Sequence, residues 1–267
     1  MRVVALVLSS SALAGCGAGT LEITARGSDA VEAGLPATAF ADSAVVTFST
    51  FVVAFDDVAV VDRGGVAAAL VSEPFVLDLH AAGPHQVARV EAQAGAYERV
   101  SLLVAPAVTG IGAGNVDAAA VDLMTSQGFS AFAAGAIESG GSTTTFSWGF
   151  AGNTRYVDCV DDDGNDGVFI PEGGVAALDF VVRGEGLFAN SLAADATTLQ
   201  VGALVAADEN VDGVIDQGEL AAVDLEDIEG YDTAGRSDVV TLADFVAARA
   251  QAMVGVGGTG TCVAERR

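Results

Sequence analysis

The sequence predicts a mainly β protein, an antiparallel sandwich followed by a short helical section. Segments rich in Val, Phe and Thr recur about every 8–12 residues with turn signals between them, which is typical of a sandwich. After Ala203 this pattern gives way to loop and helix signals. The 267 residues, 51% of them hydrophobic, can bury one large core or two smaller ones.

Most of the predicted elements are strands. They are expected at residues 21–26, 44–54, 58–61, 75–79, 86–91, 97–104, 129–134, 143–150 and 175–182. Arg63-Gly64-Gly65, Gly83-Pro84 and Gly95-Ala96 supply turn or strand-breaking residues between them. Residues 116–126 predict a helix, because Val116, Ala119, Ala120 and Leu123 share one face.

Residues 21–200 are therefore expected to form the β body, which can divide into two β subdomains near residues 107–115. Residues 201–267 form the C-terminal section, with helices predicted at 220–228 and 241–253. Thr241 is a suitable N-cap, and Asp244 three residues later makes a variant capping box.

The most informative motif is the acidic loop at residues 208–219. Oxygen-bearing side chains occupy loop positions 1, 3, 5, 9 and 12, which are Asp208, Asn210, Asp212, Asp216 and Glu219. Val214 at position 7 can offer its carbonyl, and Gly213 at position 6 permits a sharp turn. Six to eight oxygens around one centre suit Ca²⁺. The loop thus predicts a calcium site.

This 12-residue loop resembles that of the EF-hand family, and every ligand position of the family pattern is filled. The resemblance implies bound Ca²⁺, closed by both carboxylate oxygens of Glu219, and a helix leaving the loop at residues 220–228. The alternative is an acidic surface turn followed by a helix with Glu in its first turn.

A second acidic stretch, residues 161–172, fits the same pattern less well. Counting from Asp161 puts Asp163, Asn165 and Glu172 at ligand positions, but it puts Asp166 where glycine is needed. An irregular calcium loop built on Asp161, Asp163, Asn165 and Asp166 is one interpretation. A solvated hairpin loop is the other.

The N-terminus predicts export. Residues 1–15 combine a positive Met1-Arg2 start with an apolar run too short to span a bilayer. The ending Leu13-Ala14-Gly15-Cys16 resembles the lipobox of bacterial lipoproteins, in which the Cys is acylated and becomes the new N-terminus. Residues 16–20 would then be the lipidated Cys and its tether. The Gly17 that follows favours the outer membrane of a Gram-negative cell. The alternative is an ordinary signal peptide.

Export also decides how the cysteines are interpreted. With Cys16 assigned to lipid, Cys159 and Cys262 remain, and an oxidising compartment allows one pairing between them. This disulfide would fasten the C-terminal tail to the main body.

The charge composition restricts the partners and the chemistry. With 36 acidic and 11 basic residues the net charge is −25, so nucleic acids and anionic lipid head groups are not expected partners. Divalent cations and basic surfaces are attracted instead. All basic residues are Arg, which excludes a lysine Schiff base, a phosphate-binding lysine and a Ser–Lys nucleophile pair.

Three further residues are assigned to structure. His80 and His85 are an incomplete metal site, and we expect both in an exposed turn. Trp148 is expected in the core.

The segments Val76-Leu77-Asp78-Leu79 and Ala94-Gly95-Ala96-Tyr97 resemble a β-domain of bacterial envelope lipoproteins. That resemblance implies an immunoglobulin-like or similar sandwich and brings no catalytic residues with it.

The sequence therefore predicts a lipid-anchored, calcium-binding envelope protein with a structural or binding role, and not an enzyme. A calcium-stabilised extracytoplasmic hydrolase of glycosidase type is one alternative. A calcium-dependent adhesion module is the other. No motif identifies a protein or polysaccharide partner.

Overall fold

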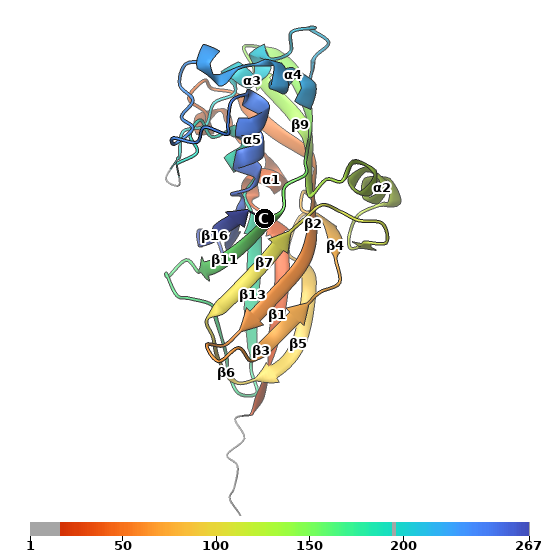
Figure 1. The fold of residues 1–267 in the computed structure, drawn as a ribbon, viewed down its shortest axis with the longest axis vertical. Helices are drawn as coiled ribbons and strands as arrows, with labels where there is room; N and C mark the ends of the chain where they lie inside the picture. Colours follow the sequence, from red (N-terminus) through yellow and green to blue (C-terminus); the bar gives the residue numbers. More distant parts are fainter. Residues whose placement is uncertain (1–16, 194–195, 267) are drawn as a thin grey trace, which may run out of the picture.

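The computed structural model describes residues 17–193 and 196–266, and it is mainly β, as the sequence predicts (Figure 1). The larger sheet is strongly curled into a half-barrel. Its strands run in the order β14 (Val214–Ile215), β10 (Ser142–Phe150), β9 (Ala131–Ser139), β2 (Val45–Val61), β7 (Arg99–Val104), β11 (Thr154–Val160) and β16 (Thr261–Arg266). Beside this path lie β3 (Ala67–Val71), β4 (Phe75–Asp78) and β8 (Gly112–Ala113).

The curl of this sheet follows from β2, a strand of 17 residues that changes partners along its length. Its first half pairs with β9 and its second half with β7 and β3. The register shifts between Phe48 and Thr50 and between Phe55 and Asp57. Such bulges bend a strand and increase its twist.

The smaller sheet has the order β15 (Val254–Val256), β13 (Val175–Val182), β1 (Ala18–Gly27) and β5 (His85–Gln93). In β1 the alternation seen in the sequence is realised, with Leu21, Ile23 and Ala25 fully buried. Because β1 and β13 are parallel, the antiparallel prediction holds only for part of the structure. In a separate two-stranded sheet, β12 (Val168–Ile170) pairs antiparallel with β6 (Gly95–Tyr97).

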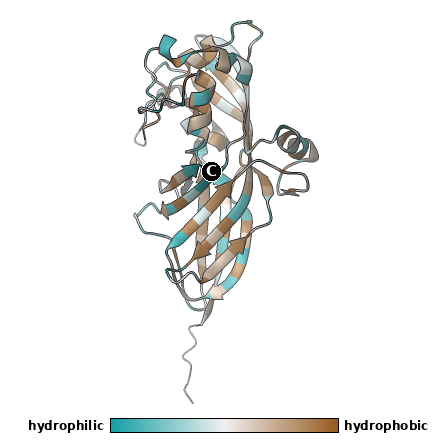
Figure 2. Cartoon of the chain, in the orientation of Figure 1, coloured by the Kyte–Doolittle hydropathy of each residue, from teal (hydrophilic) through white to brown (hydrophobic). Residues whose placement is uncertain are grey.

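Hydrophobic side chains of both sheets form the main core, and Figure 2 shows the hydrophobic residues along the strands. Trp148 is fully buried, as predicted, with its ring centroid 4.6 Å from that of Phe146 and 6.0 Å from that of Phe188. The predicted helix near residues 116–126 is α2 (Ala118–Gln127), which covers a smaller cluster around Met124.

The helices are short: α1 (Asp29–Ala33), α3 (Gly202–Ala206), α4 (Gln217–Ala222) and α5 (Leu242–Ala250). The structure also has 3-10 turns at Ala37–Ala39, Gly184–Phe188 and Leu225–Asp227. At the start of α5, Thr241 and Asp244 form the predicted capping box. Within the described part of the chain, none of the helices has the length and apolar character needed to cross a membrane.

The helix predicted at residues 220–228 is wrong in its bounds. α4 ends at Ala222, and Val223 is extended. The reason is a tertiary pairing, because the chain after α4 lies against the residues that precede α5. The Leu242 N–H donates to the Val223 carbonyl, and the Leu225 N–H donates to the Val240 carbonyl. These bonds hold Val223 and Asp224 in an extended conformation where local signals favour a helix, and the chain then forms only the 3-10 turn at Leu225–Asp227.

Two predictions are not decided by this structure. The signal peptide at residues 1–15 and Cys16 lie outside the described residues. The division of the body near residues 107–115 stays a prediction.

Candidate metal site

The 208–219 loop connects α3 to α4 at one end of the molecule's long axis (Figure 1). Its side-chain oxygens accept hydrogen bonds from the loop's own backbone. Asp208 Oδ1 accepts from the Asp212 N–H at 3.1 Å, and Asp208 Oδ2 accepts from the Gly213 N–H at 3.0 Å. Asn210 Oδ1 accepts from the same Asp212 N–H at 2.7 Å. These bonds coil the chain around its first polar side chains.

The coil places Val211 in a strained conformation. Its φ is +58°, in the left-handed region that a β-branched residue rarely adopts, and its side chain is 83% exposed. Gly213 also has positive φ, +80°, which glycine adopts without a Cβ penalty. Strain held by surrounding hydrogen bonds is frequent at ligand-binding sites.

Glu219 and Asp216 meet at the start of α4. They form a capping box, in which Asp216 Oδ1 accepts from the Glu219 N–H at 2.9 Å and Glu219 Oε2 accepts from the Asp216 N–H at 3.0 Å. The other Glu219 oxygen, Oε1, is buried without a hydrogen-bond partner. A buried carboxylate oxygen without a donor is costly, so this atom is a natural place for a cation.

The loop is fastened to the larger sheet through β14. The Thr145 N–H donates to the Gly213 carbonyl at 2.9 Å, and Trp148 Nε1 donates to the Ile215 carbonyl at 3.0 Å. Because successive carbonyls of a strand point to opposite sides, the Val214 carbonyl between them points away from β10. It is therefore free of the sheet, as its predicted role as a ligand requires.

The structure does not assemble a finished metal site. Among the residues that it describes, no group of three or more His, Cys, Asp or Glu side chains is placed to hold a metal ion. Nor does it show an EF-hand, since the helices on either side of the loop have only five and six residues. Two of the six predicted ligands, Asn210 and the Val214 carbonyl, are not side chains of these four residue types.

The second acidic stretch closes on itself. Asp161 Oδ1 accepts from the backbone N–H groups of Asp163 and Asn165 at 2.9 and 2.8 Å, and the Asn165 side chain contacts the same carboxylate. The Asn165 N–H is the main reason that the pKa of Asp161 lies below its usual value. The backbone of Asp166 forms an isolated antiparallel β-bridge with that of Val160. Glu172 lies apart, beside Gly17.

Asp162 has a role that the sequence analysis missed. Its carboxylate accepts from the backbone N–H groups of Thr259, Gly258 and Gly260 at 2.5, 3.0 and 2.8 Å. These three donors, Thr259 first, hold the pKa of Asp162 below its usual value. The glycine-rich run at residues 257–260 was the available signal, because a turn of this kind presents several N–H groups together.

Beside this contact lies the predicted disulfide between Cys159 and Cys262, which the structure contains. Val157 pairs with Val263 and Val160 with Thr261, so two residues of β11 oppose the single residue Cys262 of β16. This bulge is accompanied by a positive φ of +47° at Asp158. The disulfide and Asp162 both fasten the C-terminal tail to the body.

The two histidines are half-buried rather than exposed, and His85 is the first residue of β5 rather than part of a turn. His80 Nδ1 lies 2.9 Å from the Val31 carbonyl, and His85 Nε2 lies 3.0 Å from the Ala81 carbonyl. Both rings therefore hold backbone segments in place.

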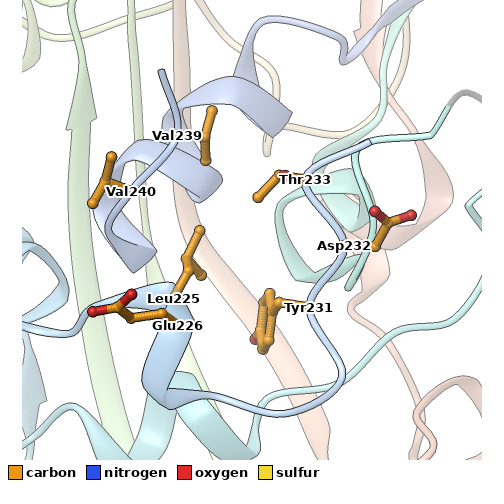
Figure 3. Close-up of a pocket in the computed structure, with 7 residues that line it drawn as sticks. All are labelled: Leu225, Glu226, Tyr231, Asp232, Thr233, Val239 and Val240. Atoms are coloured by element: carbon orange, nitrogen blue, oxygen red, sulfur yellow. The ribbon is translucent and has the colours of Figure 1, made fainter. Parts of the chain in front are cut away.

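A surface hollow of about 420 Å³ lies within the C-terminal section (Figure 3). Leu225, Tyr231 and Val239 line it, and the carboxylates of Glu226 and Asp232 lie on opposite sides. Burial raises the pKa of Tyr231 to about 12, so its hydroxyl stays protonated at neutral pH. The carboxylates do not converge on one point as paired acid–base groups do.

Comparisons with protein-family models, with curated proteins and with solved structures found no match for this chain.

Proposed function

We propose that this chain is a lipid-anchored, calcium-binding protein of the cell envelope, with a structural or binding role. One observation carries the calcium proposal. In a loop with oxygen ligands at every required position, Glu219 Oε1 is buried without a partner. A bound cation would give this oxygen the partner that it lacks.

The strain at Val211 and the direction of the Val214 carbonyl support the same proposal. Asp208, Asn210, Asp212, Asp216 and Glu219 would hold the ion together with the Val214 carbonyl. Ca²⁺ would supply positive charge that offsets the repulsion among the four carboxylates of this loop. The chain's own contribution is the β14 contact, which keeps the centre of the loop against the sheet.

Calcium that binds only the folded state stabilises it by mass action. At about 100 times the dissociation constant, the gain in unfolding free energy is about 2.7 kcal/mol. Extracellular sites often bind with dissociation constants of about 10⁻⁴–10⁻³ M, so millimolar calcium is enough for substantial occupancy.

The experiment is thermal unfolding in calcium and in chelator. Wild type should unfold at a higher temperature in calcium, and Glu219→Gln should lose most of that shift with little change in side-chain shape. Glu209→Gln is the matched control, because Glu209 is exposed and occupies a loop position without a ligand role. If both variants keep the full shift, the ion is bound elsewhere.

The anchor proposal rests on Cys16 and its lipobox. Several acyl chains on one residue attach a protein to a membrane far more strongly than a single chain. The Gly17 that follows supports the outer membrane of a Gram-negative cell. Cys16→Ser should release the protein from the membrane fraction or leave it unprocessed. A variant that fractionates like wild type would contradict the anchor.

We also propose that the β body is a variant of the immunoglobulin-like sandwich. In its favour, the Tyr97 hydroxyl donates to the Gln93 carbonyl at 2.9 Å, across the short turn between β5 and β6. A tyrosine that bonds backbone a few residues upstream is a hallmark of such sandwiches. The parallel β1–β13 pair is a departure from their antiparallel pattern.

A further inference from the structure

The chain is fixed in the fold from its first described residue. The Gly17 carbonyl accepts from the Ala94 N–H at 2.9 Å, and the Ala18 carbonyl accepts from the Gly173 N–H at 2.9 Å. β1 already begins at Ala18. At Gly19 a Cβ would lie 2.3 Å from the Pro171 carbonyl oxygen, so the backbones of these segments are packed directly together. Residues 17–20, which the sequence analysis assigned to a tether, are therefore part of the folded body.

The surface that these segments form carries little charge of its own, although Asp161, Asp166 and Asp179 line a hollow beside it together with Phe169. This surface is made of residues 17–19, 93–96 and 169–175, which we call the entry pole. Phe169 and Val175 are 66% and 56% exposed there. Glu172 is the one charged residue of the entry pole, in a chain with 36 acidic and 11 basic residues. Exposed apolar side chains grouped on an otherwise charged protein mark an interaction surface.

The length of chain between this pole and the proposed anchor identifies its partner. Consecutive Cα atoms are about 3.8 Å apart, so the acylated Cys16 would lie within about 4 Å of Gly17. The head-group layer on each side of a bilayer is about 5–8 Å thick. Acyl chains that start at the inner edge of this layer therefore draw the residues around Gly17 into it.

We propose that the entry pole is a membrane-contact surface, with Phe169 and Val175 in the lipid head-group layer. This inference rests on the proposed lipid anchor. A head-group layer accommodates apolar side chains beside polar atoms, as it does for interfacial helices. The partner is a zwitterionic rather than an anionic surface, because the chain carries a net charge of −25.

This contact also sets the orientation of the protein. β1 enters at one end of the long axis, and α3, α4 and the 208–219 loop lie at the opposite end (Figure 1). A molecule that stands on its entry pole presents the 208–219 loop away from the membrane. The loop then faces the surrounding medium, where its ion and any partner are found.

The test uses the processed, lipidated protein in phosphatidylcholine vesicles. An environment-sensitive fluorophore is attached at Val175→Cys or, as the matched control, at Val240→Cys. Both positions are 56% exposed, and Val240 lies in the C-terminal section, next to Thr241, the N-cap of α5. The native cysteines do not compete for the label, because Cys159 and Cys262 are bonded and Cys16 would be acylated.

A lipid with a spin label on its head group should quench the fluorophore at residue 175 several-fold more than at residue 240. Equal quenching at both positions on vesicle-bound protein would overturn the membrane contact while leaving the anchor intact. Failure of the lipidated protein to bind vesicles would refute the anchor, and this proposal with it.

A second variant tests the argument from chain length. About 20 Gly and Ser residues inserted between Cys16 and Gly17 would span about 25 Å on average. The anchor is kept, but the pole is no longer held at the head groups. Quenching at residue 175 should fall toward that at residue 240. If the difference between the two positions persists, the short connection is not what places the pole.

Discussion

Removing the disulfide should destabilise the protein mainly by freeing its unfolded chain. Cys159 and Cys262 are 103 residues apart in the sequence. In the chain-entropy model a cross-link that closes about 100 residues contributes about 4.7 kcal/mol at 25 °C. We therefore expect the double variant Cys159→Ala/Cys262→Ala to lose about 3–5 kcal/mol of unfolding free energy.

Urea unfolding measures this loss, and reduced wild type separates its two causes. Cys159 is only 3% exposed, so alanine there also removes packing, whereas reduction keeps the sulfur in place. Reduced wild type should show most of the loss of unfolding free energy that the double variant shows. The contacts of Asp162 with the tail should keep the folded state intact in both cases. A loss below about 1 kcal/mol would show that the cross-link does not restrict the unfolded chain as the model requires.

Three further predictions concern single residues. Asp162→Asn should lower the melting temperature at pH 7. The folded-state pKa of Asp162 is lowered, so the ionised carboxylate stabilises the fold above about pH 4 and this stabilisation is lost as the pH falls through that pKa. The difference in melting temperature between variant and wild type should therefore vanish in acid, and a difference at pH 2 equal to that at pH 7 would contradict this. Val211→Gly should raise unfolding free energy in urea by up to about 1 kcal/mol, because left-handed strain is relieved at some entropic cost; a loss would refute the strain. Trp148→Phe should lower the unfolding free energy in the same assay by about 1–3 kcal/mol or more, since the buried Ile215 carbonyl loses its hydrogen-bond donor. An unchanged unfolding free energy would refute the role of Trp148 as that donor.

The strands that could be predicted are those whose own residues alternate. β13 was predicted with its full bounds because buried and exposed residues alternate along most of its length. β2 was predicted as two strands because Asp56 and Asp57 interrupt its apolar pattern. In the structure a bulge carries the strand past them, and Asp57 accepts from Arg155 at 2.8 Å. That partner lies 98 residues away and leaves no mark on the local sequence.

The missed elements depend on distant partners in the same way. β11 contains Arg155 and Asp158, and its neighbour β16 is almost fully exposed, so neither resembles a core strand. The pairing of Cys159 with Cys262 was the one sign that these segments meet.

The ligand spacing of the 208–219 loop could likewise be read locally, but its attachment to the sheet could not. That attachment depends on Thr145 and Trp148, about 70 residues earlier. The exit helix failed for the same reason, because the residues that follow Ala222 pair with those before α5.

The central claim is that one calcium ion binds in the 208–219 loop, and calorimetric titration of the folded protein with calcium tests it most directly. We expect one ion per chain for wild type and for Glu209→Gln, and a large loss of affinity for Glu219→Gln. Two ions per chain would add a site at residues 161–172. One ion bound equally well by wild type and Glu219→Gln, or no binding at millimolar calcium, would contradict the claim.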